Sequence, residues 1–336
     1  MKIKRLLIVL GVCSLLASCD ADYPATRPLV EQQAATEAVL NISVSDSFRT
    51  RASGVNPTEE KRINGVQVFI FSPDGVLDAY QAVQGTSLQV RCSSGAKKLY
   101  VFANAPSLSA CSQESALNGA VTRLSDNYSG AFVMASGVKE INLTAGDNTV
   151  PVVVDRIAAR VEIAKITNAM SSVQHQGKTF KVLAAYLTNV AANTTYDKSA
   201  EPTDYYNKMG YHSSEVDALV YDNYSGGIQL SWNQSINDPH YLYAYPNPSS
   251  DDSTNGGTWS PRGTKLVIKA SLDGAIYYYP IVISTPLLGN KNYRIEELRI
   301  TRPGSVDEDT PVSLAQCSFS ISVSDWTQQS LGPVEI

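Results

Sequence analysis

The side chains best suited to acid–base chemistry near neutral pH are the three histidines of this chain, His175, His212 and His240. None of them belongs to a nucleophile elbow, an H-E-x-x-H helix or a clustered ligand motif. His212 and His240 lie in polar, tyrosine-rich sequence, where we expect both to be exposed. No glycine-rich phosphate loop follows a predicted strand and opens a helix. We therefore expect no catalytic residues and no cofactor, and we do not expect an enzyme.

A polar loop at residues 251–257 contains oxygen ligands of the kind that Ca²⁺ prefers. Asp251, Asp252 and Asn255 supply two carboxylates and one amide within five residues. The spacing of an EF-hand, with its terminal glutamate, is missing from this stretch. The sequence therefore predicts a solvated loop here and no metal site.

Cys19 is the residue with the clearest covalent chemistry. Residues 16–19 read Leu-Ala-Ser-Cys and resemble a bacterial lipobox, in which the cysteine is acylated and becomes the new N-terminus. A positively charged segment at 2–5 and an apolar run at 6–16 precede it, as in a signal peptide, and the run is too short to span a bilayer. Acyl chains contribute about 0.8 kcal/mol per buried CH₂, so a lipidated Cys19 would hold the chain at a membrane. An ordinary signal peptide with an incidental cysteine is the alternative.

Composition and charge narrow the class of the remaining 317 residues, enough for two domains with separate cores. Three of the 27 basic residues lie in the leader, so 24 basic residues face 32 acidic ones, a net charge of −8. No basic stripe occurs, which argues against a nucleic-acid partner. Cys92, Cys111 and Cys317 cannot all pair within the chain. A Cys92–Cys111 bridge and buried free thiols are both open.

Hydrophobic periodicity predicts an all-β chain. Most apolar segments alternate with a period of two or form short runs of Val, Ile and Tyr between turn sequences, as strands do. The predicted strands cover residues 66–71, 98–102, 139–143, 150–154, 265–268, 276–283 and 318–323. Helical periodicity is scarce, and residues 107–124 could hold one short helix. This spacing favours β-sandwiches, with a domain boundary near 155–160.

A tyrosine-rich stretch at residues 196–245 lacks clean alternation and predicts long loops on the second domain. Ten of the 18 tyrosines lie between Tyr186 and Tyr245. Tyrosines on loops can stack on sugar faces or fill protein interfaces, which makes a surface glycan-binding lipoprotein that does not polymerise an alternative function. The other interpretation is that these rings pin irregular loops to the sandwich.

The pentapeptide Ile-Ser-Val-Ser-Asp occurs at residues 42–46 and again at residues 321–325. The first copy belongs to a run in which three apolar residues alternate with polar ones and would face a core: Leu40, Ile42 and Val44. The second copy repeats this spacing: Phe319, Ile321 and Val323. Chance similarity between serine-rich strands is the alternative explanation for the repeat.

Eight short segments follow one another in a recognisable order over almost the whole mature chain. They are residues 99–106, 132–137, 152–161, 187–191, 243–247, 292–295, 300–305 and 323–326. Together with the lipobox they are similar to the fimbrillins, the FimA/Mfa-like subunits of the type V pili of Bacteroidales. Each motif alone is weak, and the combination is specific.

The resemblance implies two tandem transthyretin-like β-sandwich domains. The chain would then divide into a lipoprotein signal peptide at 1–19, a propeptide with a removable strand at 20–51, and sandwich domains at 52–157 and 158–336. The second domain would end in a donor strand. Asp20 and Asp22, directly after the lipid cysteine, resemble the surface-export signal of Bacteroidales lipoproteins. The precursor would therefore use the lipoprotein export machinery and be anchored at the outer membrane, on the cell surface.

The same resemblance implies that an Arg-specific protease trims the precursor and that subunits polymerise by strand exchange. We expect the cut after Arg51, with Arg49 as the alternative, so that the strand containing Leu40, Ile42 and Val44 is removed. The donor would then be either the segment around Ile321 or the last ten residues, whose apolar side chains are Leu331, Val334 and Ile336. Alternatively, both ends are strands of their own domains. The implied partners are other copies of the chain, related pilus subunits, the protease, and a host or bacterial surface receptor.

Overall fold

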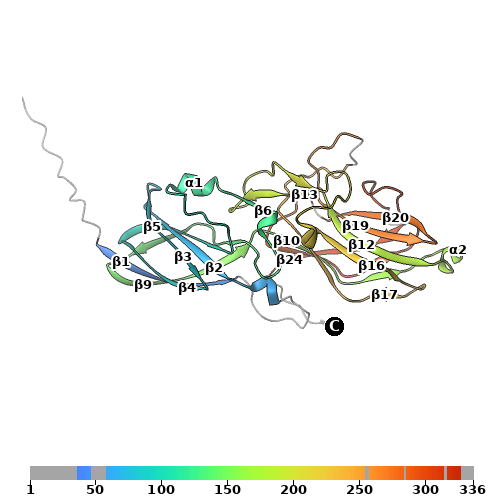
Figure 1. The fold of residues 1–336 in the computed structure, drawn as a ribbon, viewed down its shortest axis with the longest axis horizontal. Coiled ribbons are helices and arrows are strands. Elements are labelled where there is room, and N and C mark those ends of the chain that lie inside the picture. Colours follow the sequence, from blue (N-terminus) through green and yellow to red (C-terminus); the bar gives the residue numbers. More distant parts are fainter. Residues whose placement is uncertain (1–35, 47–57, 254–256, 284, 314–315, 327–336) are drawn as a thin grey trace, which may run out of the picture. The chain divides into compact units, whose positions relative to one another are not determined.

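A computed structural model describes residues 36–46, 58–253, 257–283, 285–313 and 316–326 of the chain (Figure 1). These residues form 24 strands, three short α-helices and two 3-10 helices, so the fold is almost entirely β, as predicted. Within them, no helix has the length and apolar character that would be needed to cross a membrane.

The first and largest sheet takes its strands from the N-terminal part of the chain. Its order is β3-β2-β5-β7-β9-β1-β4, and β8 also pairs with β5. The strands are β1 (Glu37–Asp46), β2 (Gly65–Phe71), β3 (Leu77–Gln84), β4 (Ser87–Ser93), β5 (Gly95–Ala103), β7 (Met134–Ala135), β8 (Lys139–Leu143) and β9 (Gly146–Arg156). Alternate residues of β1 and β4 are buried, because successive side chains of a strand point to opposite faces.

Three four-stranded sheets follow in the C-terminal part of the chain. One has the order β18-β10-β21-β24, the next β17-β11-β22-β23, and the third β16-β12-β19-β20. Their strands are β10 (Ala159–Ile163), β11 (Ile166–Asn168), β12 (Phe180–Thr188), β16 (Tyr221–Gln229), β17 (Ser235–Ile236), β18 (His240–Ala244), β19 (Lys265–Leu272), β20 (Ala275–Val282), β21 (Lys291–Ile295), β22 (Leu298–Ile300), β23 (Cys317–Ser318) and β24 (Ile321–Asp325).

Two small sheets and five short helices complete the described fold. β13 (Val190–Ala191) pairs with β15 (Tyr205–Tyr206), and β14 (Asn193–Thr195) pairs with β6 (Val121–Arg123). The helices are η1 (Thr58–Lys61), α1 (Glu114–Asn118), η2 (Leu124–Asp126), α2 (Val173–Gln176) and α3 (Asp217–Val220). The helix expected within residues 107–124 is α1, which confirms that prediction.

Two sequence predictions need correction. The stretch at 196–245 is not all loop, since β16 and β18 lie within it and pair with β12 and β10. The strand expected at 318–323 is split between β23 and β24, which belong to different sheets. In both cases the pairing partner is remote in sequence, so local alternation could not reveal it. The division into two domains near residue 157 stays a prediction.

Candidate assembly site

The strand β1 lies inside the first sheet, between β4 and β9 (Figure 1). It runs antiparallel to β4, with Leu40 opposite Val90, and parallel to β9, with Leu40 opposite Asn148. Four alternate side chains of β1 are buried in the core: Ala38, Leu40, Ile42 and Val44. We call the place that β1 occupies, between the facing edges of β4 and β9, the β1 slot.

The connection from β1 to the next described element, η1, runs through residues 47–57. Both expected cleavage positions, Arg49 and Arg51, lie in this stretch, outside the described residues. Cys19, the expected lipid site, also lies outside them. The structure therefore describes β1 and η1, the elements before and after the expected cut, but not the cleavage positions themselves.

The C-terminal end of β1 brings a carboxylate to a buried arginine. Asp46 Oδ2 accepts a hydrogen bond from Arg156 Nη2 at 3.0 Å; the Arg156 side chain is 0% exposed and that of Asp46 16%. Arg156 Nε also donates to the main-chain carbonyl oxygen of Glu60 at 2.9 Å. Burial lowers the pKa of Arg156 from its ordinary value, and the charges of Asp46 and Glu60 oppose that shift. β1 is therefore held by charge as well as by apolar packing.

Glu60, in η1, is the centre of the same buried group. Its Oε2 accepts from Arg160 Nη1 and from Trp326 Nε1, each at 2.9 Å, and its Oε1 accepts from the Tyr243 hydroxyl at 2.6 Å. Burial and the neighbouring Glu60 charge both raise the pKa of Tyr243, which keeps its phenol protonated as a donor. Glu60 thus joins η1 to β10, to β18 and to the residue after β24.

Trp326, the last described residue, is completely buried. Its ring stacks on Tyr243 with centroids 5.8 Å apart, and the guanidinium carbons of Arg156 and Arg160 lie 5.1 and 5.6 Å from its ring centroid. Cation–π contacts of this kind strengthen when they are removed from water. We call the whole group the junction cluster: Asp46, Glu60, Arg156, Arg160, Tyr243 and Trp326.

The second copy of the pentapeptide forms β24, which pairs antiparallel with β21 of the same chain, Ile321 opposite Ile295. Among the described residues β24 is the end strand of its sheet. Phe319 and Ile321 are half-buried and Val323 is exposed. The other donor candidates, Leu331, Val334 and Ile336, lie outside the described residues. The structure therefore places one candidate segment in its own sheet and does not describe the other.

Comparison with known proteins bears on what this arrangement is for. Residues 38–231, more than half of the chain, match the family model of the major fimbrial subunit protein (FimA). The chain belongs to this FimA family. The expected fimbrillin resemblance is thereby confirmed, and membership implies a structural subunit of a cell-surface fimbrium. A search of curated protein sequences found no significant match.

Solved structures with the same fold extend over most of this FimA-family chain. A fimbrilin (fimA) from Porphyromonas gingivalis W83 has 15% identity and a TM-score of 0.64, covering 87% of this chain and 98% of its own. A candidate cell adhesion protein from Parabacteroides distasonis has 19% identity and a TM-score of 0.64, covering 90% and 99%. The tip fimbrial protein Mfa3 from Porphyromonas gingivalis, with a C-terminal truncation, has 12% identity and a TM-score of 0.52, covering 87% and 99%. At these identities the likeness establishes the fold alone.

The tyrosines considered for sugar binding are engaged within the FimA-family chain itself. Tyr205 packs against Trp259 with ring centroids 5.0 Å apart. Tyr206 donates its hydroxyl hydrogen to Glu215, and Tyr211 donates to Asp217 while its ring stacks on Tyr221. These contacts favour the interpretation that the rings pin loops to the sheets.

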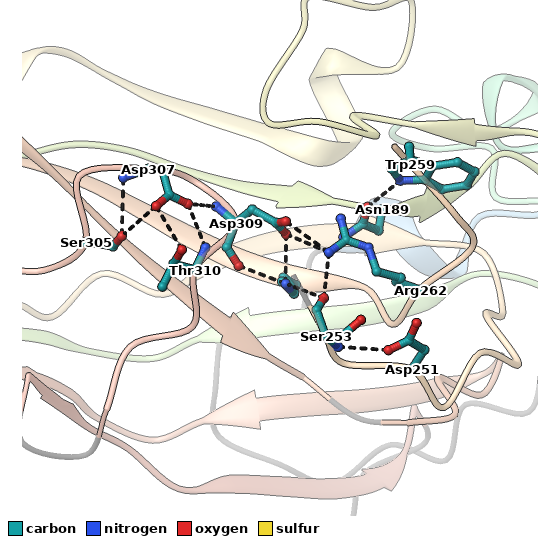
Figure 2. Close-up of polar contacts among 10 residues, drawn as sticks. Asn189, Asp251, Ser253, Trp259, Arg262, Ser305, Asp307, Asp309 and Thr310 are labelled. Atoms are coloured by element: carbon teal, nitrogen blue, oxygen red, sulfur yellow. Dashed lines mark hydrogen bonds and ion pairs between the residues drawn. The ribbon is translucent and has the colours of Figure 1, made fainter. Parts of the chain in front are cut away.

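Figure 2 shows a second polar cluster, which includes Asp251 and Ser253 of the polar loop predicted at residues 251–257. Arg262 and Lys265, both buried, donate to the Asp309 carboxylate at 3.0 and 2.8 Å. Arg262 also donates to the Ser253 carbonyl oxygen, so the cluster ties the loop to residue 309. Asp251 accepts from the Ser253 amide and is exposed, and Asn255 lies outside the described residues. Among the described residues, no three His, Cys, Asp or Glu side chains gather as metal ligands would.

The histidines and cysteines complete the chemistry expected from the sequence. His212 is exposed, as predicted, but the prediction for His240 is wrong. His240 begins β18, is largely buried, and its Nδ1 lies 2.5 Å from Asp222 Oδ2 on the neighbouring β16. Among the residues that the structure describes, Cys92, Cys111 and Cys317 are free thiols, so the bridge considered between Cys92 and Cys111 is absent. Burial raises the pKa of the Cys317 thiol to about 12, so this thiol stays protonated at neutral pH.

Sequence reasoning missed the junction cluster. Its members are spread from residue 46 to residue 326, and no local pattern joins them. One signal was present: Arg156 and Arg160 interrupt the apolar run at 152–161, and charged residues are almost never fully buried unless they are paired. That interruption predicts nearby carboxylates without saying which ones.

Proposed function

We propose that this FimA-family chain is a polymerising subunit of a pilus with a role in adhesion. An Arg-specific protease cuts after Arg51, or after Arg49, and the C-terminal segment of a neighbouring subunit replaces β1. The observation that carries the proposal is the position of β1, an interior strand. Its only covalent connection to the rest of the described chain is through residues 47–57. A cut in that stretch separates β1 covalently from the sheet that it completes.

Loss of β1 would leave an open β1 slot. Buried residues of both neighbouring strands would be uncovered, including Val90 of β4 and Val152 of β9. The main-chain N–H and C=O groups on the facing edges would lose their partners, which makes those edges templates for another strand. A strand from a neighbouring subunit restores both the ladder and the core by β-strand addition. Three apolar side chains would contribute on the order of 5–8 kcal/mol before the cost of ordering the strand.

The tail at 327–336 is the donor that we favour. The other candidate, the segment around Ile321, already pairs with β21, and Trp326 after it is buried in the junction cluster. Donating that segment would require both contacts to break. The tail, with Leu331, Val334 and Ile336, follows Trp326 directly and can be donated while β24 stays in place.

We further propose that the precursor is a lipoprotein acylated at Cys19 and carried to the outer surface by the lipoprotein export machinery. The motif at 16–19 and the two aspartates after it support this route. The variant Cys19→Ala should lose lipid labelling and surface display. Unchanged surface yield of Cys19→Ala would show that the lipoprotein route is wrong, whatever the mode of assembly.

The assembly proposal is tested by combining two changes at opposite ends of the chain. The double variant Arg49→Ala/Arg51→Ala should remain a folded monomer after treatment with an Arg-specific protease, as judged by size-exclusion chromatography and electron microscopy. Arg302→Ala, at an exposed position, is the matched control and should polymerise normally. Deletion of 327–336 should also stop polymerisation of trimmed protein. Normal polymers from the double variant would refute trimming, and normal polymers from the deletion would leave the segment around Ile321 as donor.

Glycan binding by the tyrosine-rich region is the weaker candidate. If the rings act in packing, the triple variant Tyr205→Ala/Tyr206→Ala/Tyr211→Ala should have a lower melting temperature and no glycan ligand to lose. The alternative would be favoured if the purified monomer bound a glycan and this variant lost that binding without a change in melting temperature.

A further inference from the structure

The ion pair at the end of β1 has a consequence for what can replace β1. We propose that Arg156 makes the β1 slot selective for strands that carry a carboxylate at the position of Asp46. This inference rests on the proposed function, in which β1 leaves and another strand enters. A replacement strand then needs a carboxylate as well as alternating apolar side chains. Arg156 is the residue that imposes the need for the carboxylate.

Arg156 needs an anionic partner because it is fully removed from water. Its side chain is 0% exposed, and Asp46 Oδ2 lies 3.0 Å from its Nη2. The neighbouring carboxylate of Glu60 already accepts hydrogen bonds from Arg160, Tyr243 and Trp326. Removing one partner of a buried ion pair is strongly unfavourable, since the other charge stays buried with less compensation. β1 takes Asp46 with it when it leaves, so a replacement strand that covers Arg156 again without a carboxylate would bury that charge with less compensation.

The register of β1 on β9 fixes where the new carboxylate must lie. The strands are parallel, with Ile42 opposite Val150, Val44 opposite Val152 and Asp46 opposite Val154. Arg156 follows Val154 by two residues on the same strand, so both side chains lie on one face. A replacement strand of the same direction and register therefore needs two apolar residues at alternate positions and an acidic residue two positions later.

The C-terminal segment of a second copy of this chain meets that requirement in either of two ways. Residues 321–325 reproduce 42–46 residue for residue, which places Asp325 where Asp46 stands. In the tail, Leu331, Pro333 and Glu335 have the same spacing, with Glu335 in the place of Asp46, and in this register Val334 and Ile336 lie on the other face of the strand. Pro333 would then replace Val44, whose N–H donates to the Thr86 carbonyl oxygen, so that one bond at the start of β4 would be lost.

Peptide exchange on the full chain tests the inference directly. The chain is nicked with an Arg-specific protease, and displacement of β1 is followed by fluorescence anisotropy with a labelled peptide of residues 37–48. The same peptide carrying Asp46→Asn should bind at least tenfold more weakly. On the Arg156→Gln chain the two peptides should differ by less than twofold, and on Arg156→Lys, which keeps the charge, the preference for Asp should persist.

The outcomes separate this inference from the proposed function. Equal binding of the Asp and Asn peptides to the unaltered chain would overturn the role of Arg156 while leaving strand replacement intact. A preference for Asp that persists undiminished on Arg156→Gln would overturn it as well. If no peptide displaces β1 under any condition, strand replacement and the selectivity fail together.

Assembly of the trimmed full chain then identifies the carboxylate. We expect Glu335→Gln to slow polymerisation at least tenfold on the unaltered chain, and to have less than a twofold effect when Arg156→Gln is also present. If Asp325→Asn behaves in this way instead, the role of Arg156 holds and residues 321–325 are the donor. If neither substitution depends on Arg156, the inference is wrong.

Discussion

The strands β1 and β24 share the pentapeptide Ile-Ser-Val-Ser-Asp but have different environments. β1 lies between two strands, and Val44 in it is 6% exposed. β24 pairs with β21 alone among the described residues, and the corresponding Val323 is 54% exposed. The same five residues thus form an interior strand in one place and an edge strand in another.

The two aspartates at the ends of these strands differ in the same way. Asp46 pairs with Arg156, which is 0% exposed, whereas Asp325 is 65% exposed and pairs with the partly exposed Lys291. Exposed pairs contribute little because water screens them, while a buried charge depends on its partner. Alternation within a strand therefore decides which side chains share a face, and the neighbouring strands decide how much each side chain contributes to stability.

The largest expected effect lies just beyond β24. If β24 itself contributes little to stability, the C-terminal end of β24 must be held by Trp326, which is buried in the junction cluster and donates a hydrogen bond to Glu60. Trp326→Ala should lower the free energy of unfolding by about 3–5 kcal/mol, measured by urea denaturation. The exposed Trp232 is the matched control, and Trp232→Ala should cost less than about 1 kcal/mol. Equal costs for the two tryptophans would mean that the cluster does not anchor this end of the chain.

The two aspartates should differ next most strongly. Asp46→Asn keeps the shape but removes the charge that faces Arg156, and it should lower the free energy of unfolding by about 2–3 kcal/mol, since Asp46 is not fully buried. Asp325→Asn should cost about 0.5 kcal/mol or less. Both costs should be measured at two salt concentrations, because only the exposed pair should weaken with salt. A similar small cost at both positions would contradict the buried character of the Asp46–Arg156 pair.

The smallest expected difference comes from the two valines. Val44→Thr preserves the volume but places a hydroxyl group in the core, which should cost about 1–2 kcal/mol. Val323→Thr puts the same hydroxyl group in water, so the melting temperature should stay within about 1 °C of the unaltered chain. Thermal unfolding of the two variants side by side makes the comparison. Should both variants melt alike, β1 would not be the interior strand described above.

Much of the fold follows from short stretches of sequence. The alternation of Leu40, Ile42 and Val44 predicts one buried face, and the structure buries that face. The strands at 66–71 and 139–143 were predicted from alternation or from short apolar runs between turns, and the structure has β2 and β8 there. A side-chain period is a property of neighbouring residues, so it can be read without knowing what the strand packs against.

Other features depended on contacts between distant parts of the chain. Residues 318–323 alternate like one strand, yet tertiary pairing divides them between two sheets, and His240 is covered because β16 brings Asp222 to it. The repeated pentapeptide carries no sign of which copy is interior.

The sequence by itself determined the all-β class, the alternating faces of the strands and the resemblance to fimbrial subunits, because each of these depends on residues that lie close together along the chain. Only the tertiary structure decided that Asp46, Glu60, Arg156 and Trp326 meet. These residues lie between 14 and 280 positions apart. An ion pair requires a separation of a few ångströms in space, and the folded sheets alone bring residues so distant in sequence to that separation.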